Sequence, residues 1–149
     1  MARLPRVHAP CGHFGYVRKN SRFCTFCEWA DPSKRARYRH GDITKGARAG
    51  TRWPVHITRN EFEIWYCREA RINDACHYCG VDRIYLREAG SNLCSWHIDR
   101  MDNSRPYEEG NLALACDHCN TWKGAHRTYA EARSYGAARR RDREQEGQR

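Results

Sequence analysis

The sequence lacks a long apolar run. Its 149 residues are 40% hydrophobic, and the mean hydropathy is −0.98. No segment approaches the length of a membrane span, and the N-terminal residues contain no apolar stretch like that of a secretory signal peptide. We therefore expect a cytoplasmic chain. So few aliphatic residues exclude a large core, so one ordinary domain or two small ones would need added cross-links.

Cysteine, in contrast, is abundant, and it supplies candidates for those cross-links. Six of the nine cysteines form three CxxC pairs: Cys24/Cys27, Cys76/Cys79 and Cys116/Cys119. In a reducing compartment such pairs are typical of zinc sites. A disulfide framework is the alternative, and the odd number of cysteines and the missing signal peptide argue against it.

Acidic residues are scarce in the first part of the chain. Residues 1–59 contain 13 Lys and Arg against 3 Asp and Glu, whereas residues 60–149 contain 14 against 15. This asymmetry within a net charge of +9 favours a polyanion-binding first part joined to a domain that needs its own carboxylates. Simple solubility is the alternative interpretation.

The first predicted unit, residues 1–32, contains one candidate zinc site. Cys11 and His13 precede the Cys24/Cys27 pair, and three Cys with one His suit a tetrahedral zinc ion in a zinc-ribbon-like module. His8 is a substitute ligand. A site made by the CxxC pair alone is the alternative.

A basic linker is predicted over residues 33–57. Its cations are interleaved with Tyr38 and Trp53, and they are Lys34, Arg35, Arg37, Arg39, Lys45, Arg48 and Arg52. We expect a short helix over residues 33–39 and a linker interrupted by glycine beyond it. Such a segment can follow a phosphate backbone and become ordered on binding; a solvated linker without contacts is the alternative.

Two capping boxes predict the starts of two helices. Thr58 with Glu61 begins a helix over residues 59–72, whose aromatic residues recur at helical spacing. Cys67 lies on this helix and is expected to be buried as a small apolar residue. Thr128 with Glu131 begins a helix over residues 129–146, inside a C-terminal segment of residues 128–149. Its arginines 139–141 complement the helix dipole or contact phosphate.

The strongest metal signal is the combination of Cys76, Cys79, Cys116 and Cys119, which predicts a structural zinc site. The 36 residues between the two pairs exceed the spacing of a simple zinc finger, so something is inserted there. Two short strands are expected in this insertion, within residues 82–90 and 92–98, and a helix is expected to begin near residues 119–120.

Chemistry-bearing residues are concentrated around the end of the second expected strand. Side chains alternate along a strand, so His97 and Asp99 point to the same side. Asn120 follows the second CxxC pair, and its amide oxygen, like a carboxylate oxygen, suits Mg²⁺ or Mn²⁺. His97 is the candidate general base, and Arg100 and Lys123 are candidate phosphate contacts.

Other interpretations of these residues remain open. His97 can be a core histidine, or a third metal ligand with the water activated in another way. Asp99 and Arg100 can form a surface ion pair. Three further histidines are rival bases: His77, His118 and His126.

This pattern resembles the HNH nucleases with a ββα-metal fold, particularly the small zinc-containing enzymes of phage genomes. The resemblance covers about residues 58–124 within a predicted core of residues 58–127. It implies a small, metal-stabilised α+β fold in which Asp99 and Asn120 hold a divalent metal and Asn111 braces a loop and orients the base. Many HNH enzymes carry a histidine directly after the aspartate, where this sequence has Arg100.

The resemblance implies a DNA endonuclease that hydrolyses phosphodiester bonds, and nicking is the expectation for one chain with one active centre. It leaves phage packaging or recombination proteins open as partners. Arg100 keeps a second hypothesis alive, an inactive zinc-stabilised DNA-binding accessory or regulatory protein. A zinc nucleobase deaminase needs a His-x-Glu or Cys-x-Glu motif followed by Pro-Cys-x-x-Cys, whereas this sequence has His-x-Asp and CxxC pairs that match each other.

Overall fold

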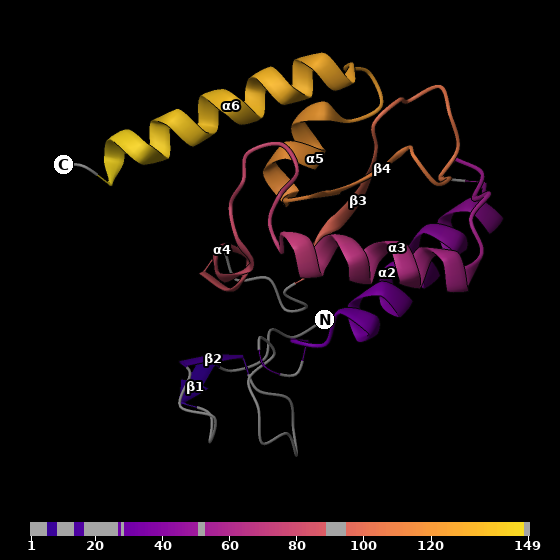
Figure 1. Cartoon of the computed structure of the whole chain (residues 1–149), viewed down its shortest axis with the longest axis horizontal. Helices are drawn as coiled ribbons and strands as arrows, with labels where there is room; N and C mark the ends of the chain where they lie inside the picture. The colour runs from indigo at the N-terminus through magenta and orange to yellow at the C-terminus, as the bar shows by residue number, and fades with distance from the viewer. Residues whose placement is uncertain are drawn as a thin grey trace.

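The structure is a computed structural model and describes residues 6–8, 14–16, 27, 29–50, 53–88 and 95–147 (Figure 1). Its elements in chain order are β1 Arg6–His8, β2 Phe14–Tyr16, α2 Pro32–Arg48, α3 Arg59–Ile72, α4 Arg83–Glu88, β3 His97–Arg100, β4 Leu112–Ala115, α5 Asp117–Lys123 and α6 Tyr129–Glu146. β1 pairs antiparallel with β2, and β3 pairs antiparallel with β4. Within the described ranges, no helix has the length and apolar character of a membrane span.

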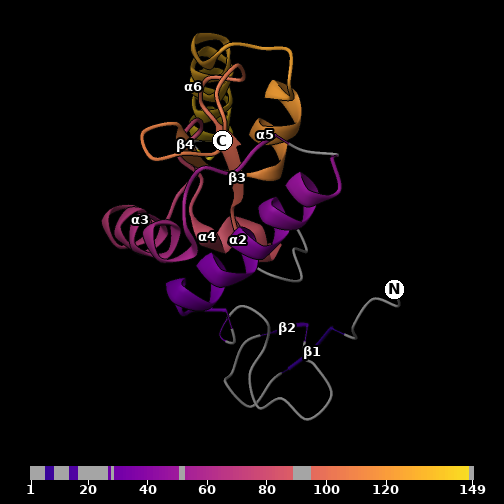
Figure 2. The same ribbon diagram turned by 90° about the vertical axis from the view of Figure 1, so that its right-hand side faces the viewer.

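The β3–β4 pair lies at the centre of the molecule. Helices α2 and α3 lie side by side against one side of it, and α5 and α6 lie on the other side, as Figures 1 and 2 show. The apolar core runs through these layers and contains several large aromatic residues, among them Phe62, Trp65, Tyr66, Tyr78 and Trp96. A fully buried side chain of this size contributes about 1.5–3 kcal/mol.

Helices α3 and α6 have the bounds that the sequence predicts. In both, the N-cap threonine accepts a hydrogen bond from the N3 backbone and the N3 glutamate accepts one from the N-cap backbone. Each reciprocal pair satisfies two N–H groups that would otherwise have no intrahelical partner. Cys67 is buried on α3, as expected.

Helix α2 is longer than predicted, and the expectation of a linker interrupted by glycine beyond residue 39 is wrong. Asp31 caps the helix by accepting a hydrogen bond from the Ser33 backbone at 2.9 Å, and Pro32 begins it, where its missing N–H costs nothing. The buried face of α2 mixes Ala36 and Ile43 with two arginines. Arginines in an apolar stripe hide the helical periodicity.

Those arginines can be buried because each has hydrogen-bond acceptors inside the fold. Arg35 donates to both carboxylate oxygens of Asp74, at 2.8 and 3.0 Å, and Arg39 donates to the Ser95 carbonyl at 2.9 Å. A bidentate guanidinium–carboxylate pair offsets the cost of burying charge. Helix α2 is therefore part of the folded body and carries one wall of the pocket described below.

The strand expected within residues 82–90 is also wrong, because α4 occupies that place. Asp82 accepts hydrogen bonds from the backbones of Ile84 at 2.9 Å and Tyr85 at 3.2 Å, which begins a short helix. The second expected strand is present, but it begins at His97 in the structure.

Candidate active site

The four cysteines of the last two CxxC pairs form one cluster. Cys76, Cys79, Cys116 and Cys119 are buried, and their Sγ atoms all lie within 4.8 Å of one another. The Cys79 and Cys116 sulfurs are 3.8 Å apart, which is about the spacing of two sulfurs bound to one tetrahedral zinc ion. Hydrogen bonds from the Cys116 and Cys119 thiols lower the pKa of Cys76 to about 7. The donor set and its geometry therefore fit a metal such as zinc.

The cluster joins the turn that follows α3 to helix α5. Cys116 is the N-cap of α5 and Cys119 lies in its first turns. The His77 backbone donates to the Leu114 carbonyl at 2.7 Å, which attaches the first cysteine pair to β4. Gly80 follows that pair with a φ of +69°, a conformation that favours glycine. A bound metal would thus fix Asn120 and Tyr78, each next to a cysteine in the chain.

The predicted N-terminal zinc site lies almost entirely outside the described residues. This applies to Cys11, His13 and Cys24, while Cys27 is described and half-buried. The site stays a prediction.

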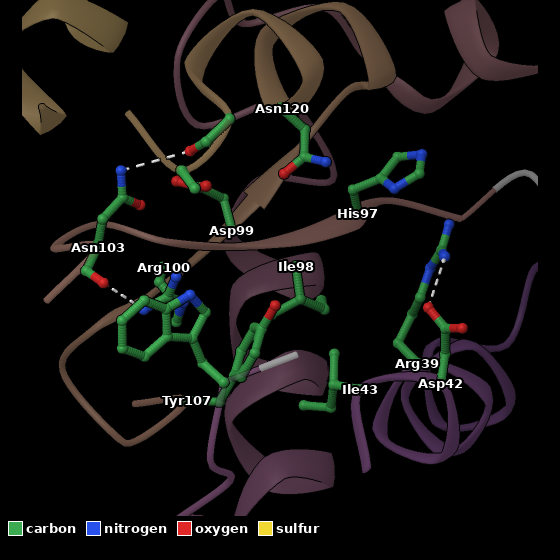
Figure 3. A pocket seen from close by; sticks show the side chains of 13 residues that line it. Arg39, Asp42, Ile43, His97, Ile98, Asp99, Arg100, Asn103, Tyr107 and Asn120 are labelled. Atoms are coloured by element: carbon green, nitrogen blue, oxygen red, sulfur yellow. Dashed lines mark hydrogen bonds and ion pairs between the residues drawn. The ribbon is translucent and has the colours of Figure 1, made fainter. Parts of the chain in front are cut away.

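A polar pocket of about 370 Å³ runs along β3 and receives side chains from α2 and α5 as well. Within the part of the chain that the structure describes, β3 pairs on one edge only, with β4. His97 and Asp99 point to the side of β3 where Asn120 lies, and Ile98 and Arg100 point to the other side (Figure 3). The structure therefore brings together the three side chains that the sequence singles out for metal binding and base catalysis.

Asp99 is buried, with an exposed fraction of 6%. Its carboxylate accepts a hydrogen bond from the Tyr78 hydroxyl and pairs with the Lys123 ammonium at 3.3 Å. Burial raises the pKa of Asp99 above its usual range, although the bonds from Tyr78 and Lys123 act in the opposite direction. A buried carboxylate of this kind gains from a nearby cation.

Sequence reasoning missed Tyr78. The residue lies inside the first CxxC pair, and that position was the one available signal, because a zinc site fixes whatever lies between its ligands. Burial and the Asp99 charge raise the pKa of the Tyr78 phenol, so the phenol remains a hydrogen-bond donor to Asp99.

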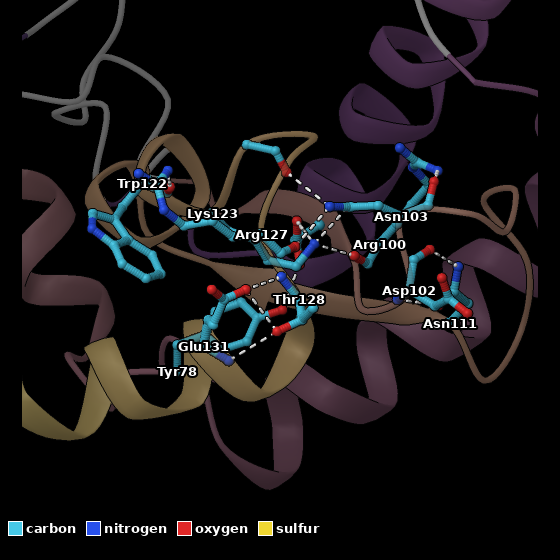
Figure 4. Close-up of polar contacts among 12 residues, drawn as sticks. Tyr78, Arg100, Asp102, Asn103, Asn111, Trp122, Lys123, Arg127, Thr128 and Glu131 are labelled. Carbon is cyan, nitrogen blue, oxygen red and sulfur yellow. Dashed lines mark hydrogen bonds and ion pairs between the residues drawn. The ribbon is translucent and has the colours of Figure 1, made fainter.

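Lys123 does not lie where a phosphate contact is expected. Its side chain is fully buried, and its ammonium group donates to the Arg100 carbonyl at 2.6 Å and to Asn103 Oδ1 at 2.7 Å, in addition to Asp99 (Figure 4). The three partners use all three donors of the ammonium group. The predicted phosphate contact is therefore wrong, because the last turn of α5 directs this side chain under β3.

Arg100 is also held by the protein. Its Nη1 donates to the carbonyls of Asn103 at 2.6 Å and Arg105 at 2.7 Å, and its guanidinium lies 4.4 Å from the ring centre of Trp53. Burial lowers its pKa, but a guanidinium is not deprotonated in a protein. Arg100 therefore cannot act as a general base, and it holds the loop after β3.

Asn111 has the geometry of a loop brace. Its side chain accepts from the Asp102 backbone at 2.8 Å and donates to the carbonyls of Asp102 at 3.1 Å and Pro106 at 3.0 Å. It is buried and does not line the pocket. This is the position of the loop-bracing role that the resemblance implies; the orientation of a base by Asn111 stays a prediction.

His97 is the histidine that lines the pocket among the described residues. Its side chain is 37% exposed and its Nε2 lies 3.5 Å from Asp117 Oδ1. The rival bases lie elsewhere: His77 hydrogen-bonds to Tyr129 at 2.9 Å, His118 packs near Tyr85, and His126 lines a different pocket.

Comparison with known proteins agrees with this geometry. No protein-family model matches the sequence, and a search of curated proteins finds no match. A search of solved structures finds one described as a rare-cutting HNH restriction endonuclease, PacI, at 21% identity and a TM-score of 0.61, covering 99% of each chain. The chain therefore has the fold of an HNH endonuclease. The predicted small α+β fold is confirmed, and the likeness extends beyond residues 58–124.

Proposed function

We propose that this chain is a divalent-metal-dependent endonuclease that hydrolyses phosphodiester bonds in DNA. The observation that carries the proposal is the convergence of Asp99 from β3 and Asn120 from α5 on one pocket, in a chain with the HNH fold. The solved structure that this chain resembles is described as a restriction endonuclease, an enzyme that cuts DNA. With one such centre among the residues that the structure describes, nicking of one strand is the expected reaction.

The residues of this pocket fit Mg²⁺ or Mn²⁺. Two of the lone pairs of Asp99 are used by Tyr78 and Lys123, which leaves further acceptor capacity on its oxygens. The side-chain amide of Asn120 makes no hydrogen bond to another described residue, and its oxygen is available as a ligand. When bound, the metal supplies a positive charge that stabilises the phosphoryl transition state and the leaving oxygen.

The protein groups around Asp99 hold its carboxylate in place. Tyr78 and Lys123 fix its orientation, and both are themselves buried. A ligand fixed before the substrate arrives loses little conformational freedom on binding, so the geometry is set in advance of the reaction.

His97 is the proposed general base. Imidazole exchanges a proton near neutral pH, and Asp117 at 3.5 Å can orient the ring. The proton of the attacking water would pass to His97, and the half-exposed side chain can release it to solvent.

Plasmid nicking in Mg²⁺ or Mn²⁺ tests the proposal. Wild type should nick, and His97→Ala, Asp99→Ala and Asn120→Ala should lose most of the rate. Asp142→Ala removes an exposed carboxylate on α6 and is the matched control. If Asp99→Ala nicks as fast as the control, the assigned site is wrong.

A second candidate function is an inactive DNA-binding accessory protein, and the observation that favours it is the fixed arginine in the usual base position. DNA binding without nicking by wild type would support it over the enzyme.

DNA as the partner is supported by the exposed side of α2. A groove there is lined by Arg37, His40, Lys45, Arg48 and Arg59, with no carboxylate among its lining residues. A preformed basic helix can contact phosphates without first becoming ordered, which replaces the expectation of a linker that folds on binding.

A structural zinc ion in the four-cysteine cluster completes the proposal. Metal analysis of the purified protein should give one zinc equivalent for this cluster and a second if the N-terminal site also binds. Loss of one equivalent after Cys116→Ser would assign it to the cluster.

A further inference from the structure

A half-exposed tryptophan lies in the wall of the active-site pocket. Trp53 is 47% exposed, and it shares the pocket with Asp99 and Asn120. The other large hydrophobic residues with high exposure, such as Tyr38 and Ile72, do not line this pocket. Large aromatic surface left open beside polar catalytic groups is a common feature of ligand sites.

The Trp53 indole is held in place by the Arg100 guanidinium and by the backbone pairing of the residues that follow it. Its ring centre lies 4.4 Å from the Arg100 guanidinium, which is buried and bonded to two carbonyls. The segment after Trp53 is paired with Tyr107: the Tyr107 backbone donates to the Pro54 carbonyl at 2.9 Å, and the His56 backbone donates to the Tyr107 carbonyl at 2.8 Å. The exposed part of the ring is therefore presented by a rigid support.

The ring is close to the proposed chemistry. Arg100 directly follows Asp99, so their Cα atoms are about 3.8 Å apart, and their side chains lie on opposite sides of β3 (Figure 3). The pocket is lined by side chains from both sides of the strand. A base that rests on Trp53 would therefore lie in the same pocket as Asp99 and Asn120.

Resting on the proposed function, we propose that Trp53 is a stacking platform for an unpaired DNA base next to the scissile phosphate. Aromatic side chains backed by arginine bind bases through their π faces, whatever the sequence. A base inside a duplex has both faces covered by its neighbours, so only a base outside the stack can use the platform. The substrate class is DNA with an unpaired nucleotide, such as a single strand, a mismatch or a junction.

Binding of two 20-nucleotide single strands of equal length tests the platform, one with ordinary bases and one with abasic sugars at its central positions. Without added divalent metal, wild type should bind the strand with bases about 5- to 150-fold more tightly, the contribution of one stacked base. Trp53→Ala should reduce this ratio towards one, and Trp53→Phe should keep part of it.

Tyr38→Ala is the matched control. Tyr38 is 42% exposed and its ring faces an arginine at 5.6 Å, but it lies outside the pocket. This variant should keep the full ratio. Its loss in Tyr38→Ala would overturn the assignment to Trp53.

The outcomes separate this inference from the function on which it rests. If wild type nicks plasmid and Trp53→Ala keeps the wild-type ratio, the platform is wrong and the nuclease stands. An equal loss of affinity for both strands in Trp53→Ala also overturns the platform, because the base then contributes nothing. If wild type fails to nick, the proposed nuclease is wrong, whatever the base-dependent ratio shows.

Discussion

The two sides of strand β3 are built in different ways. On one side, Asp99 is held by Tyr78 and Lys123, and these side chains come from the four-cysteine turn and from α5. On the other side, Arg100 is held by loop carbonyls and covered by Trp53. The first side fixes the carboxylate that we propose as a metal ligand, and the second fixes an aromatic surface and a loop.

This difference explains how a strand of four residues can end in adjacent charges of opposite sign. Alternation sends the two side chains apart, so they do not neutralise each other as a simple ion pair. Each instead has its own set of buried partners. The comparison predicts that changes on the Asp99 side affect folding and catalysis together, whereas changes on the Arg100 side affect substrate binding more than folding.

Removal of the zinc ion that we propose for the four-cysteine cluster should have the largest effect, because the cluster joins the elements that carry Tyr78 and Asn120. Cys116→Ser with Cys119→Ser, or a strong chelator, should unfold residues of the β3–β4 and α5 region. Structural zinc contributes on the order of 10 kcal/mol in small domains. Circular dichroism and zinc content, measured on the same samples, check this. If zinc-free protein unfolded at the same temperature as zinc-loaded protein, this prediction would be contradicted.

Lys123→Met should be the next most damaging change. It leaves the Asp99 carboxylate buried without its cation, and breaking a buried pair costs about 3–5 kcal/mol. Urea unfolding measures the loss. Lys45→Met, at an exposed position on α2, is the control and should change stability by no more than about 0.5 kcal/mol. Equal free energies of unfolding for the two variants would contradict a stabilising contact between Lys123 and Asp99.

Gly136→Ala tests the contact between α6 and the cysteine turn. A Cβ at this position would lie 2.4 Å from backbone atoms of Tyr78, so the helix must move away from the residue that holds Asp99. We expect a loss of about 1–3 kcal/mol and slower nicking. Gly41→Ala is the matched control, since a Cβ there meets nothing within 4 Å, and it should stabilise α2 by about 0.5–1 kcal/mol. If both variants changed the free energy of unfolding in the same direction, the result would be inconsistent with the packing of α6 on Tyr78.

On the exposed side of α2, away from both sides of β3, Lys45→Ala with Arg48→Ala should weaken DNA binding without loss of fold. Each phosphate contact removed lowers the salt dependence, so the slope of log K against log salt should fall by about 2. Fluorescence anisotropy at several salt concentrations measures it. An unchanged slope would exclude this face of α2 from the DNA interface.

Much of this fold could be predicted from local patterns. The capping boxes at Thr58 and Thr128 fixed the starts of α3 and α6, and the CxxC spacing predicted the cluster. Strand alternation placed His97 and Asp99 on one side of β3. These signals depend only on neighbouring residues.

The errors involve partners that are far apart in the sequence. Arg35 and Arg39 occupy the buried face of α2 because Asp74 and Ser95 receive them, and no local pattern predicts those pairs. The burial of Lys123 likewise depends on where α5 crosses β3. The sequence therefore predicts phosphate contacts for cations such as Arg35, Arg39 and Lys123, which in the structure stabilise the fold.

The most direct test of the central claim combines Mn²⁺ binding with plasmid nicking on zinc-loaded protein. Calorimetry should show one Mn²⁺ site beyond the zinc in wild type and in Asp142→Ala, and both should nick DNA. Asp99→Ala and Asn120→Ala should lose the Mn²⁺ site and the nicking together. Nicking by Asp99→Ala at the wild-type rate, or an intact Mn²⁺ site in that variant, would contradict the account.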